Sequence, residues 1–426
     1  MSLRAALNPG VRRRELFGWA MYDFANSAYT TVVITTVYSA YFVAAVCENA
    51  RWGTLAWTAV LSLSYLLILL TAPAMGAFAD QRGAKKRLLL WLTLGCVLGT
   101  LGLMLTGPGT VALALGLILL SNWCFGSGEN VTAAFLPELA RPEAMGKVSG
   151  FSWSLGYIGG LVALAACIAW LKLGPDAAGV PGTLAITAAF FALGSVCTFV
   201  WLKERATPHP GGPQGFVALV RDSLGQTLAS LRGLKDWPEL KQLLWCILAY
   251  QAGIMTIITL AAIYATQALG FTTEQTLLMI GVVNITAAIG AFAFGYVQDA
   301  LGHRRALALC LIGWILTIVL LGVGQGNTAF WIAANLAGLN LGAAQSAGRA
   351  MVGYLAPPAR TGEFFGLWGL SVKAASILGP LSYGLISFLT DNNHRIAMLA
   401  TGVYFVLGWW ILRTLDMQRG RARVVG

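Results

Sequence analysis

The chain has 426 residues, of which 57% are hydrophobic and only 11% are charged, and its mean hydropathy is +0.71. A soluble chain of this length would form two or three domains with far more charge on their surfaces, so the composition excludes a water-soluble globular protein. The formal net charge of +11 also raises a nucleic-acid-binding surface, but the placement of the charges along the chain favours a membrane protein without nucleic acid as a partner.

Apolar segments long enough to cross a bilayer recur along the whole chain. Because a helix rises about 1.5 Å per residue, roughly 20 apolar residues span a hydrocarbon core of about 30 Å. Six such segments precede a polar gap, near residues 16–46, 54–79, 88–106, 111–136, 148–171 and 184–202. Six more follow it, near residues 241–267, 274–297, 306–323, 328–351, 364–389 and 395–413. These segments are too long for barrel strands, so we predict an all-α polytopic membrane protein with 12 transmembrane helices.

The basic residues of the predicted loops lie almost entirely on one side of the membrane. Only Arg51, Lys172 and Arg395 fall in loops on the opposite side. Because cytoplasmic loops carry the Lys and Arg of membrane proteins, we expect both termini in the cytoplasm and the protein in a bacterial inner membrane. The first segment is basic but leads into an apolar span far longer than that of a signal peptide, so we expect it to be retained.

Cysteine and histidine give no sign of a metal site. The seven cysteines occur singly in or beside apolar spans, as small buried side chains do. The histidines all fall in predicted loops, namely His209, His303 and His394. The sequence also lacks the HExxH motif of metalloproteases and the GxxxxGK[ST] phosphate loop of ATP-driven proteins. We therefore expect no metal, no cofactor and no enzymatic activity.

The longest polar stretch, residues 203–240, divides the chain in two. We predict an N-terminal six-helix bundle over residues 1–202, a cytoplasmic linker over 203–240 and a C-terminal six-helix bundle over 241–426. Within the linker, apolar residues recur every three or four positions from Val217 to Leu231. This spacing indicates an amphipathic helix that lies on the inner membrane surface or serves as a plain tether between the halves.

A motif of the form G-x3-D-x2-G-x-[KR]-[KR] occurs once in each half. Its two copies are Gly76, Asp80, Gly83, Lys85 and Lys86, and then Gly295, Asp299, Gly302, Arg304 and Arg305. The first Gly of each copy permits close helix packing, the second permits a tight turn, and the Asp is placed to cap the N-terminus of an adjacent helix. Glu129 and Arg349 repeat at nearly the same spacing as the two motifs, which indicates duplication of a six-helix unit.

Several segments carry a family resemblance that covers nearly the whole chain. The loop GAFADQRGAKKR resembles the signature of the major facilitator superfamily between helices 2 and 3, although Gln81 stands where that pattern usually has a basic residue. The segments Trp19–Tyr29, Glu129–Leu139 and Glu363–Pro380 resemble the "unknown major facilitator" branch, which is related to the fungal vacuolar amino-acid effluxers. The resemblance implies two pseudo-symmetric six-helix bundles about a central cavity that opens alternately to either side and moves a small solute.

Four ionisable residues, Asp23, Glu129, Arg349 and Lys373, lie roughly 12 to 15 Å from the inner surface. Such charges are costly in a bilayer, so each is expected to face a cavity or a partner. We predict proton coupling at Asp23 or Glu129, with Asp23 preferred and a structural hydrogen-bonding role as its alternative. Glu129 and Arg349 are expected either to meet as a gate when the cytoplasmic side closes or to pair permanently within their own bundles.

Lys373 is expected either to bind an acidic group of the solute or simply to neutralise Glu129 or Asp23. With Asp23 it would suit a zwitterion such as an amino acid. Other polar or amphipathic residues of the apolar helices are cavity candidates: Tyr22, Asn26, Trp153, Tyr157, Tyr250, Gln251, Asn284, Asn340, Gln345 and Trp368. The sequence thus predicts a monomeric, proton-coupled secondary transporter in the lipid bilayer that exports an amino acid or similar small molecule. The alternative is a lipid translocator or a transport-inactive membrane sensor of the same fold.

Overall fold

The computed structural model describes residues 3–48, 50, 52–173, 179–205, 225, 228–263, 273–324, 326–391 and 394–425. Long helices dominate both halves. The first half contains α1 (Arg13–Ala28), α2 (Val37–Tyr41), α3 (Gly53–Arg82), α4 (Lys85–Gly102), α5 (Val111–Ala133), α6 (Leu136–Leu139), α7 (Met145–Leu173) and α8 (Gly179–Trp201). The second half contains α10 (Pro238–Ile263), α11 (Thr273–Leu301), α12 (His303–Val323), α13 (Gly326–Leu355), α14 (Thr361–Leu389), α15 (His394–Leu412) and α16 (Met417–Val425).

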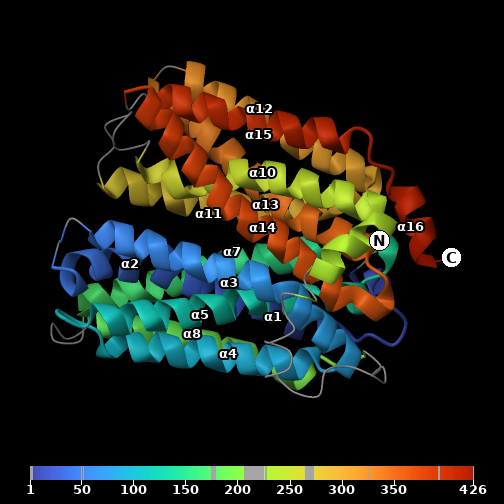
Figure 1. The fold of residues 1–426 in the computed structure, drawn as a ribbon, viewed down its shortest axis with the longest axis horizontal. Coiled ribbons are helices and arrows are strands. Elements are labelled where there is room, and N and C mark those ends of the chain that lie inside the picture. The colour runs from blue at the N-terminus through green and yellow to red at the C-terminus, as the bar shows by residue number, and fades with distance from the viewer. Residues whose placement is uncertain are drawn as a thin grey trace.

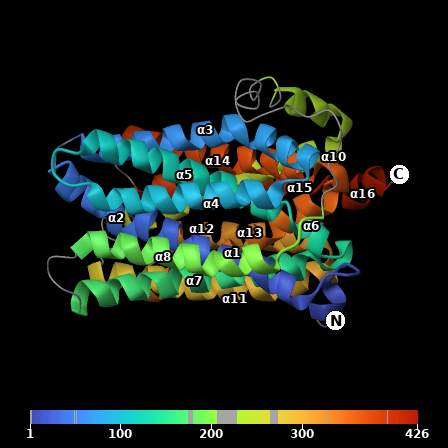
Figure 2. The ribbon, with the colours of Figure 1, turned by 90° about the horizontal axis from the view of Figure 1, so that it is seen from below.

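The helices form two bundles whose long axes run side by side. Figure 1 shows the blue and green helices α1–α8 in the lower bundle and the yellow to red helices α10–α15 in the upper one. Helix α3 packs against α14, and α7 packs against α11 and α13, so these helices form most of the interface. Both termini lie at the same end of the molecule (Figures 1 and 2). We call it the terminus-bearing end.

The helices have the length and surface of membrane spans. Within the described residues, 11 helical segments are long and apolar enough to cross a bilayer. Helix α13 occupies the remaining position of the twelve expected; it is 30 residues long but carries Asn335, Asn340, Gln345 and Arg349. Large apolar side chains such as Leu98 and Leu193 are exposed on the outer faces, where lipid replaces water as the contact. The predicted helical membrane class is confirmed, and a count of twelve is consistent with it.

Each bundle has an apolar core of its own. One cluster of buried side chains is drawn almost wholly from α1–α8 and the other almost wholly from α10–α16. The exceptions are few: Ala350 packs in the first cluster, and Ala133 and Ala134 pack in the second. The bundles are therefore separately packed bodies that meet across small side chains.

The first predicted span, 16–46, is not a single regular α-helix. Helix α1 ends at Ala28 and is followed by π-helical turns over Tyr29–Thr36 and Phe42–Val46. The hydroxyls of Thr35 and Thr36 donate to carbonyl oxygens five residues earlier, at 2.8 and 2.6 Å. The β-branched run TTVVITT crowds a regular α-helix and offers these competing donors, which explains the wider turns over Tyr29–Thr36.

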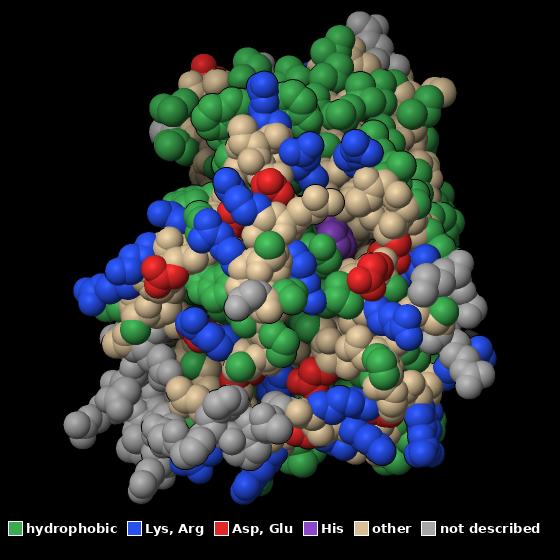
Figure 3. Space-filling model, turned by 90° about the vertical axis from the view of Figure 1, so that its right-hand side faces the viewer, with side chains coloured by type: hydrophobic (Ala, Val, Ile, Leu, Met, Phe, Trp, Pro, Cys, Tyr) green, Lys and Arg blue, Asp and Glu red, His purple; other side chains and the backbone are tan. Residues whose placement is uncertain are grey.

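Tight turns close two helices at the terminus-bearing end. Gly83 ends α3 with φ 57°, and Gly302 precedes α12 with φ 86°, both in the range that favours glycine. Figure 3 looks onto this end and shows Lys and Arg side chains gathered over it. The amphipathic helix predicted within the linker falls mostly outside the described residues, although residues 228–233 are helical.

Candidate functional site

Two ion pairs within the spans join the bundles. On one side of the interface, Arg349 Nη1 of α13 lies 2.6 Å from Asp23 Oδ2 of α1. On the other, Lys373 Nζ of α14 lies 3.1 Å from Glu129 Oε2 of α5. The first half supplies the acid of each pair and the second half supplies the base. All four membrane-depth charges predicted from the sequence are thereby neutralised across the interface.

The Arg349 guanidinium reaches fully into the first bundle. The side chain is 3% exposed, and besides Asp23 it donates from Nε to Ser149 Oγ at 3.1 Å and from Nη2 to the Ser149 carbonyl at 3.0 Å. The rings of Trp19 and Trp153 lie 4.9 and 5.2 Å from the guanidinium carbon. A planar guanidinium suits this site because it makes several directed hydrogen bonds while its faces stack on aromatic rings.

Asp23 is held by contacts from two helices, α7 and α13. Ser152 of α7 donates its hydroxyl to Asp23 Oδ2 at 2.6 Å, and Gly156, one turn further, leaves room for the α1 backbone at Asp23. The Ser27 hydroxyl donates to the backbone carbonyl of Asp23 at 2.7 Å, so this hydroxyl bonds within its own helix. The carboxylate is 14% exposed. It is therefore an almost enclosed acid that is paired with Arg349.

The Glu129–Lys373 pair is held more loosely. The Lys373 stem passes Gly126 of α5, where an added Cβ would lie 3.2 Å from its Cε, and its ammonium lies 5.5 Å from the Tyr65 ring. Glu129 is 27% exposed, nearly twice the exposed fraction of Asp23. This pair is therefore the more exposed of the two and is held by fewer bonds.

The expected pairing of Glu129 with Arg349 is wrong in this conformation, and so is the alternative that each pairs within its own bundle. The two residues occupy equivalent helices of the duplicated halves, but α5 packs against α14 whereas α13 packs against α7. The pseudo-twofold relation therefore turns them toward opposite sides of the interface. Each finds a partner in the other bundle, Lys373 for Glu129 and Asp23 for Arg349.

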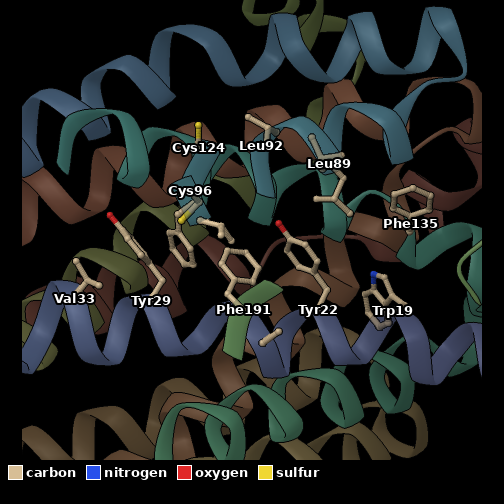
Figure 4. Close-up of a cluster of buried hydrophobic side chains, with 14 of the residues drawn as sticks. Trp19, Tyr22, Tyr29, Val33, Leu89, Leu92, Cys96, Cys124, Phe135 and Phe191 are labelled. Atoms are coloured by element: carbon tan, nitrogen blue, oxygen red, sulfur yellow. The ribbon is translucent and has the colours of Figure 1, made fainter. Parts of the chain in front are cut away.

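Tyr22 and Asn26 of α1 are buried inside the first bundle. The Tyr22 hydroxyl shares a hydrogen bond of 3.2 Å with Thr93 of α4 and lies over Gly128 of α5, where an added Cβ would be 2.7 Å away. Figure 4 shows Tyr22 pointing from its helix into the cluster of apolar side chains. Asn26 is 5% exposed. The structure thus places the predicted candidate Tyr22 in the packing of the bundle, one residue away from the ion pair.

Further polar candidates lie on α7, α10, α13 and α14. Gln251 of α10 donates to the Gln345 side chain of α13, which ties two helices of the second bundle together. Tyr157 lies beside Trp153, with ring centroids 5.9 Å apart. Trp368 is 5% exposed, and its indole N–H has no partner among the described residues. The described residues hold no group of three or more His, Cys, Asp or Glu that could hold a metal ion.

The first copy of the duplicated motif caps a helix of the other bundle. Asp80, at the end of α3, accepts hydrogen bonds from the backbone N–H groups of Gly362 at 2.9 Å and Glu363 at 3.0 Å. These groups form the first turn of α14, where N–H groups lack partners within the helix and the helix dipole favours a negative charge. This is the helix-capping contact that the motif predicts.

The second copy makes the reciprocal contact. Asp299, at the end of α11, accepts from the backbone N–H groups of Gly146 at 3.0 Å and Lys147 at 3.2 Å in the first turn of α7. The Lys147 ammonium adds a charge contact of 3.7 Å. Each half therefore holds the acid that caps a helix of the other half, and both contacts lie at the terminus-bearing end.

The leading glycines of the motif bring backbones into contact at the same two places. A Cβ added to Gly76 would lie 2.0 Å from the Gly362 carbonyl oxygen, and one added to Gly295 would lie 2.7 Å from that of Gly146. Side chains at these positions would force the bundles apart. The terminus-bearing end is therefore closed by direct helix-to-helix packing.

The basic residues of the two motif copies differ in their partners. Lys85 is 1% exposed; it pairs with Glu138, lies 3.7 Å from Asp80 and donates to the Thr361 hydroxyl at 2.8 Å. Its counterpart Arg304 instead donates at 3.4 Å to backbone carbonyls that follow α15. Lys85 thus adds a fully buried cation to the first contact, whereas the cation at the second contact is the partly buried Lys147.

Sequence reasoning missed Ser149, Ser152 and Glu138. The two serines share one face of α7 with Trp153 and Gly156, at helical spacings of three and four residues, and this small polar face was a usable signal. Glu138 follows a proline in the predicted loop and carried no signal, because its partner Lys85 is distant in the sequence.

Comparison with known proteins shows similarity to transporters over nearly the whole chain. Residues 56–425 match the family model described as "Vacuole effluxer Atg22 like". A Bacillus subtilis protein described as "Uncharacterized MFS-type transporter YxiO" is 27% identical over 410 residues, 92% of this chain and 93% of that protein. Autophagy-related protein 22 of Saccharomyces cerevisiae is 24% identical over 428 residues, 85% of this chain and 78% of that protein.

Solved structures show the same architecture at low sequence identity. The human organic anion transporter MFSD10 (TETRAN) gives a TM-score of 0.77 at 16% identity, covering 94% of this chain and 99% of that one. A bacterial homologue of the iron transporter ferroportin, in an outward-facing state, gives 0.70 at 14% identity, covering 94% and 98%. The proton:xylose symporter XylE gives 0.69 at 14% identity, covering 95% and 94%. The chain belongs to the Atg22-like family of major facilitator superfamily transporters.

Proposed function

We propose that the protein is a secondary active transporter that moves a small solute across the membrane by alternating access. The observation that carries the proposal is the pair of ion pairs within the spans, Asp23–Arg349 and Glu129–Lys373, each of which joins one bundle to the other. Charges at this depth are retained where they bind a solute, an ion or each other in a way that depends on conformation. Separating the bundles would break both pairs.

The proposal assigns proton coupling to Asp23 or Glu129. Protonating Asp23 would leave the Arg349 guanidinium buried without its carboxylate, and breaking a buried pair in this way costs about 3–5 kcal/mol. Proton uptake at Asp23 would therefore favour separation of α1 from α13. The same argument applies to Glu129 with a smaller energy, because this carboxylate is 27% exposed.

Amino-acid efflux is the transport reaction that we propose for this site. In a zwitterionic solute, the ammonium could pair with Glu129 and the carboxylate with Lys373. Such a solute could therefore replace the contact between these two side chains. The sequence assigned the zwitterion to Lys373 and Asp23, but the structure pairs Lys373 with Glu129. The description of the matched family, "Vacuole effluxer Atg22 like", supports the movement of a solute across a membrane.

We further propose that residues 1–202 and 241–426 move as the two bodies, with 203–240 as their linker. Their separately packed cores support this division. In this proposal the terminus-bearing end faces the cytoplasm of a bacterial cell, a monomer is the working unit, and the closed caps at Asp80 and Asp299 describe a conformation sealed on the cytoplasmic side.

Ligand-dependent stability of the purified protein tests the proposal. Wild type, Asp23→Asn and Lys373→Ala are melted in the presence of single amino acids and other metabolites, because a ligand that binds the folded state raises the melting temperature by mass action. We expect at least one zwitterion to stabilise wild type and Asp23→Asn, and Lys373→Ala to lose that stabilisation. In proteoliposomes, wild type should move the same compound when a pH gradient is applied, and Asp23→Asn should not respond to the gradient.

Two outcomes would contradict parts of this proposal. Stabilisation by lipids with no response to any soluble compound would favour a lipid translocator or a sensor. Flux of the compound that is indifferent to the pH gradient in wild type would remove proton coupling and leave the transporter assignment standing.

A further inference from the structure

A basic groove lies at the terminus-bearing end of the second bundle, outside the site described above. It has a volume of about 220 Å³ and lies between the start of α12 and the end of α15. Its lining consists of Arg304, Arg305, Ala308, Trp409, Leu412 and Arg413. Three guanidinium groups thus share one small groove with an indole and two aliphatic side chains.

No ion pair within the described residues neutralises these three arginines. Arg304 donates only to the carbonyl oxygens of Arg413 and Leu415, both at 3.4 Å, and the Arg413 guanidinium lies 5.8 Å over the Trp409 ring. Like charges that line one groove repel each other, and an anion bound between them would relieve that repulsion. Within the described residues, the groove is therefore lined by three positive charges without a carboxylate in ion-pair contact.

Asp416 is the acid that lies nearest in the sequence, and it is engaged elsewhere. Its Oδ1 accepts hydrogen bonds of 3.0 Å from the backbone N–H groups of Gln418 and Arg419 at the start of α16. The bond from Arg419, together with the nearby Arg304 charge, holds the pKa of this carboxyl below its ordinary value. Asp416 caps a helix and is not part of the groove lining.

The duplicated half shows what the groove lacks. In the first half, the backbone N–H of Lys86 at the start of α4 donates to Glu204 Oε2 at 2.7 Å, and its ammonium donates to the Leu202 carbonyl at 2.6 Å. Glu204 comes shortly after α8. The corresponding segment after α15 carries Arg413, and its acid, Asp416, caps α16. The first half thus directs its acid to the start of α4, whereas the acid of the second half caps α16 and Arg413 lines the groove beside the start of α12.

We propose that this groove binds the phosphate group of an anionic phospholipid in the leaflet at the terminus-bearing end. Arginine pairs well with phosphate because its fork of N–H donors matches two phosphate oxygens. The volume is below the roughly 300–1,000 Å³ of small-molecule pockets, which suits a headgroup phosphate whose chains remain in the bilayer.

The surroundings of the groove favour a lipid over a soluble anion. Trp410, which follows a lining residue on α15, is 61% exposed, and Leu309 and Ile312 of α12 are 46% and 43% exposed. Exposed tryptophan is typical of the membrane interface, and exposed aliphatic side chains one or two turns away offer contact to acyl chains. Basic residues near a membrane surface attract anionic lipids by about 1 kcal/mol each. The inference stands apart from the transport reaction and does not depend on it.

The test uses full-length protein in mixed micelles and compares three additions: phosphatidylglycerol, phosphatidylcholine and inorganic phosphate. The groove variant carries Arg304→Gln, Arg305→Gln and Arg413→Gln. The matched control carries Arg12→Gln, Arg13→Gln and Arg14→Gln, which removes the same charge from exposed arginines at the same end. The readout is the melting temperature as a function of lipid concentration.

We expect phosphatidylglycerol to stabilise wild type and the control more than phosphatidylcholine does, and the groove variant to lose this difference. Each single arginine change should weaken the apparent affinity roughly fivefold. A groove variant that keeps the full difference would overturn the proposal. Inorganic phosphate that stabilises as well as phosphatidylglycerol would also overturn it, because the groove would then be a site for soluble anions. If the triple variant fails to fold, Arg305→Gln alone decides by the same fivefold criterion.

Discussion

At the scale of single residues, Arg349 is the side chain that joins the second bundle to the first. It leaves α13, enters the first bundle, and there meets Asp23, both polar groups of Ser149, and two indole rings. Lys373 crosses the interface in the same direction but makes one hydrogen bond, to Glu129. The two pairs therefore differ in strength, and this difference can be measured.

The stronger pair should show energetic coupling. We expect Arg349→Gln to destabilise the protein by about 3–5 kcal/mol, because it leaves the Asp23 carboxylate buried and unpaired. Adding Asp23→Asn should recover part of that loss, with a coupling energy of about 0.5–3 kcal/mol in a double-mutant cycle of melting experiments. Arg349→Lys should not restore stability, since an ammonium lacks the planar fork. Additive effects of the two single changes would contradict a direct pair.

Substitutions in the weaker pair, Glu129–Lys373, should reduce the stability of the protein less. Because Glu129 is 27% exposed and meets a single donor, we expect Lys373→Gln to cost about 1 kcal/mol or less in the same melting experiments. Glu129→Gln should behave similarly. A loss as large as that of Arg349→Gln would show that the two pairs are equally buried in solution and would argue against a solute-accessible pair at this position.

At the scale of helices, the interface is closed by two contacts of the same design. Asp80 caps α14 and Asp299 caps α7, with a glycine one turn earlier allowing the backbones to touch. The contact at α14 has the additional buried Lys85 and its partner Glu138. We expect the α3–α14 contact to be the firmer of the two.

A single methyl group at this contact should open the terminus-bearing end. In Gly76→Ala the new Cβ would lie 2.0 Å from the Gly362 carbonyl oxygen, so the helices must separate. The measurement is the labelling rate of Ser346→Cys, a buried position on α13, by a membrane-impermeant maleimide after replacement of the partly exposed Cys197. We expect labelling several-fold faster than in the parent protein.

Gly116→Ala provides the control for that experiment. Gly116 is also a helical glycine of the first bundle, but an added Cβ would meet nothing within 4 Å. Alanine there should be neutral or stabilise the helix by up to about 1 kcal/mol, and the labelling rate should not change. Equal acceleration by both changes would mean that labelling reports general loosening and not separation at Gly76.

The helices and their interface could be predicted from the sequence to different extents. The spans and the capping role of the motif follow from local patterns, namely apolar runs of sufficient length and an acid followed by glycine at the end of a helix. The partners of Glu129 and Arg349 could not be predicted, because a repeat gives equivalent positions but not the direction each faces. The π-helical turns after Ala28 were also missed, since their β-branched run has the same hydropathy as a regular span.

At the scale of the whole molecule, charge defines one end. Lys and Arg cover the end that carries both termini (Figure 3), and the sequence places only Arg51, Lys172 and Arg395 in loops at the other. From the positive-inside rule we predict that the terminus-bearing end faces the cytoplasm.

Reporter fusions test this orientation. A fluorescent protein fused after the C-terminus should fluoresce in a bacterial host, because it remains in the cytoplasm. Alkaline phosphatase inserted in the loops near Arg51 and Lys172 should be active, since that enzyme needs the periplasm to form its disulfides. Phosphatase activity at the C-terminus instead would reverse the topology.

The halves meet through helix caps and through ion pairs, and only the caps follow the internal duplication. The caps are equivalent in the two halves, because each half contains both an acid that caps and a helix that is capped. The ion pairs do not, because both acids lie in the first half and both bases in the second. Two copies of the first half could still cap each other but would bring four buried carboxylates together, and two copies of the second half would gather only cations. The halves have thus become complementary partners that neither copy can replace, and the fused chain makes the correct pairing unavoidable.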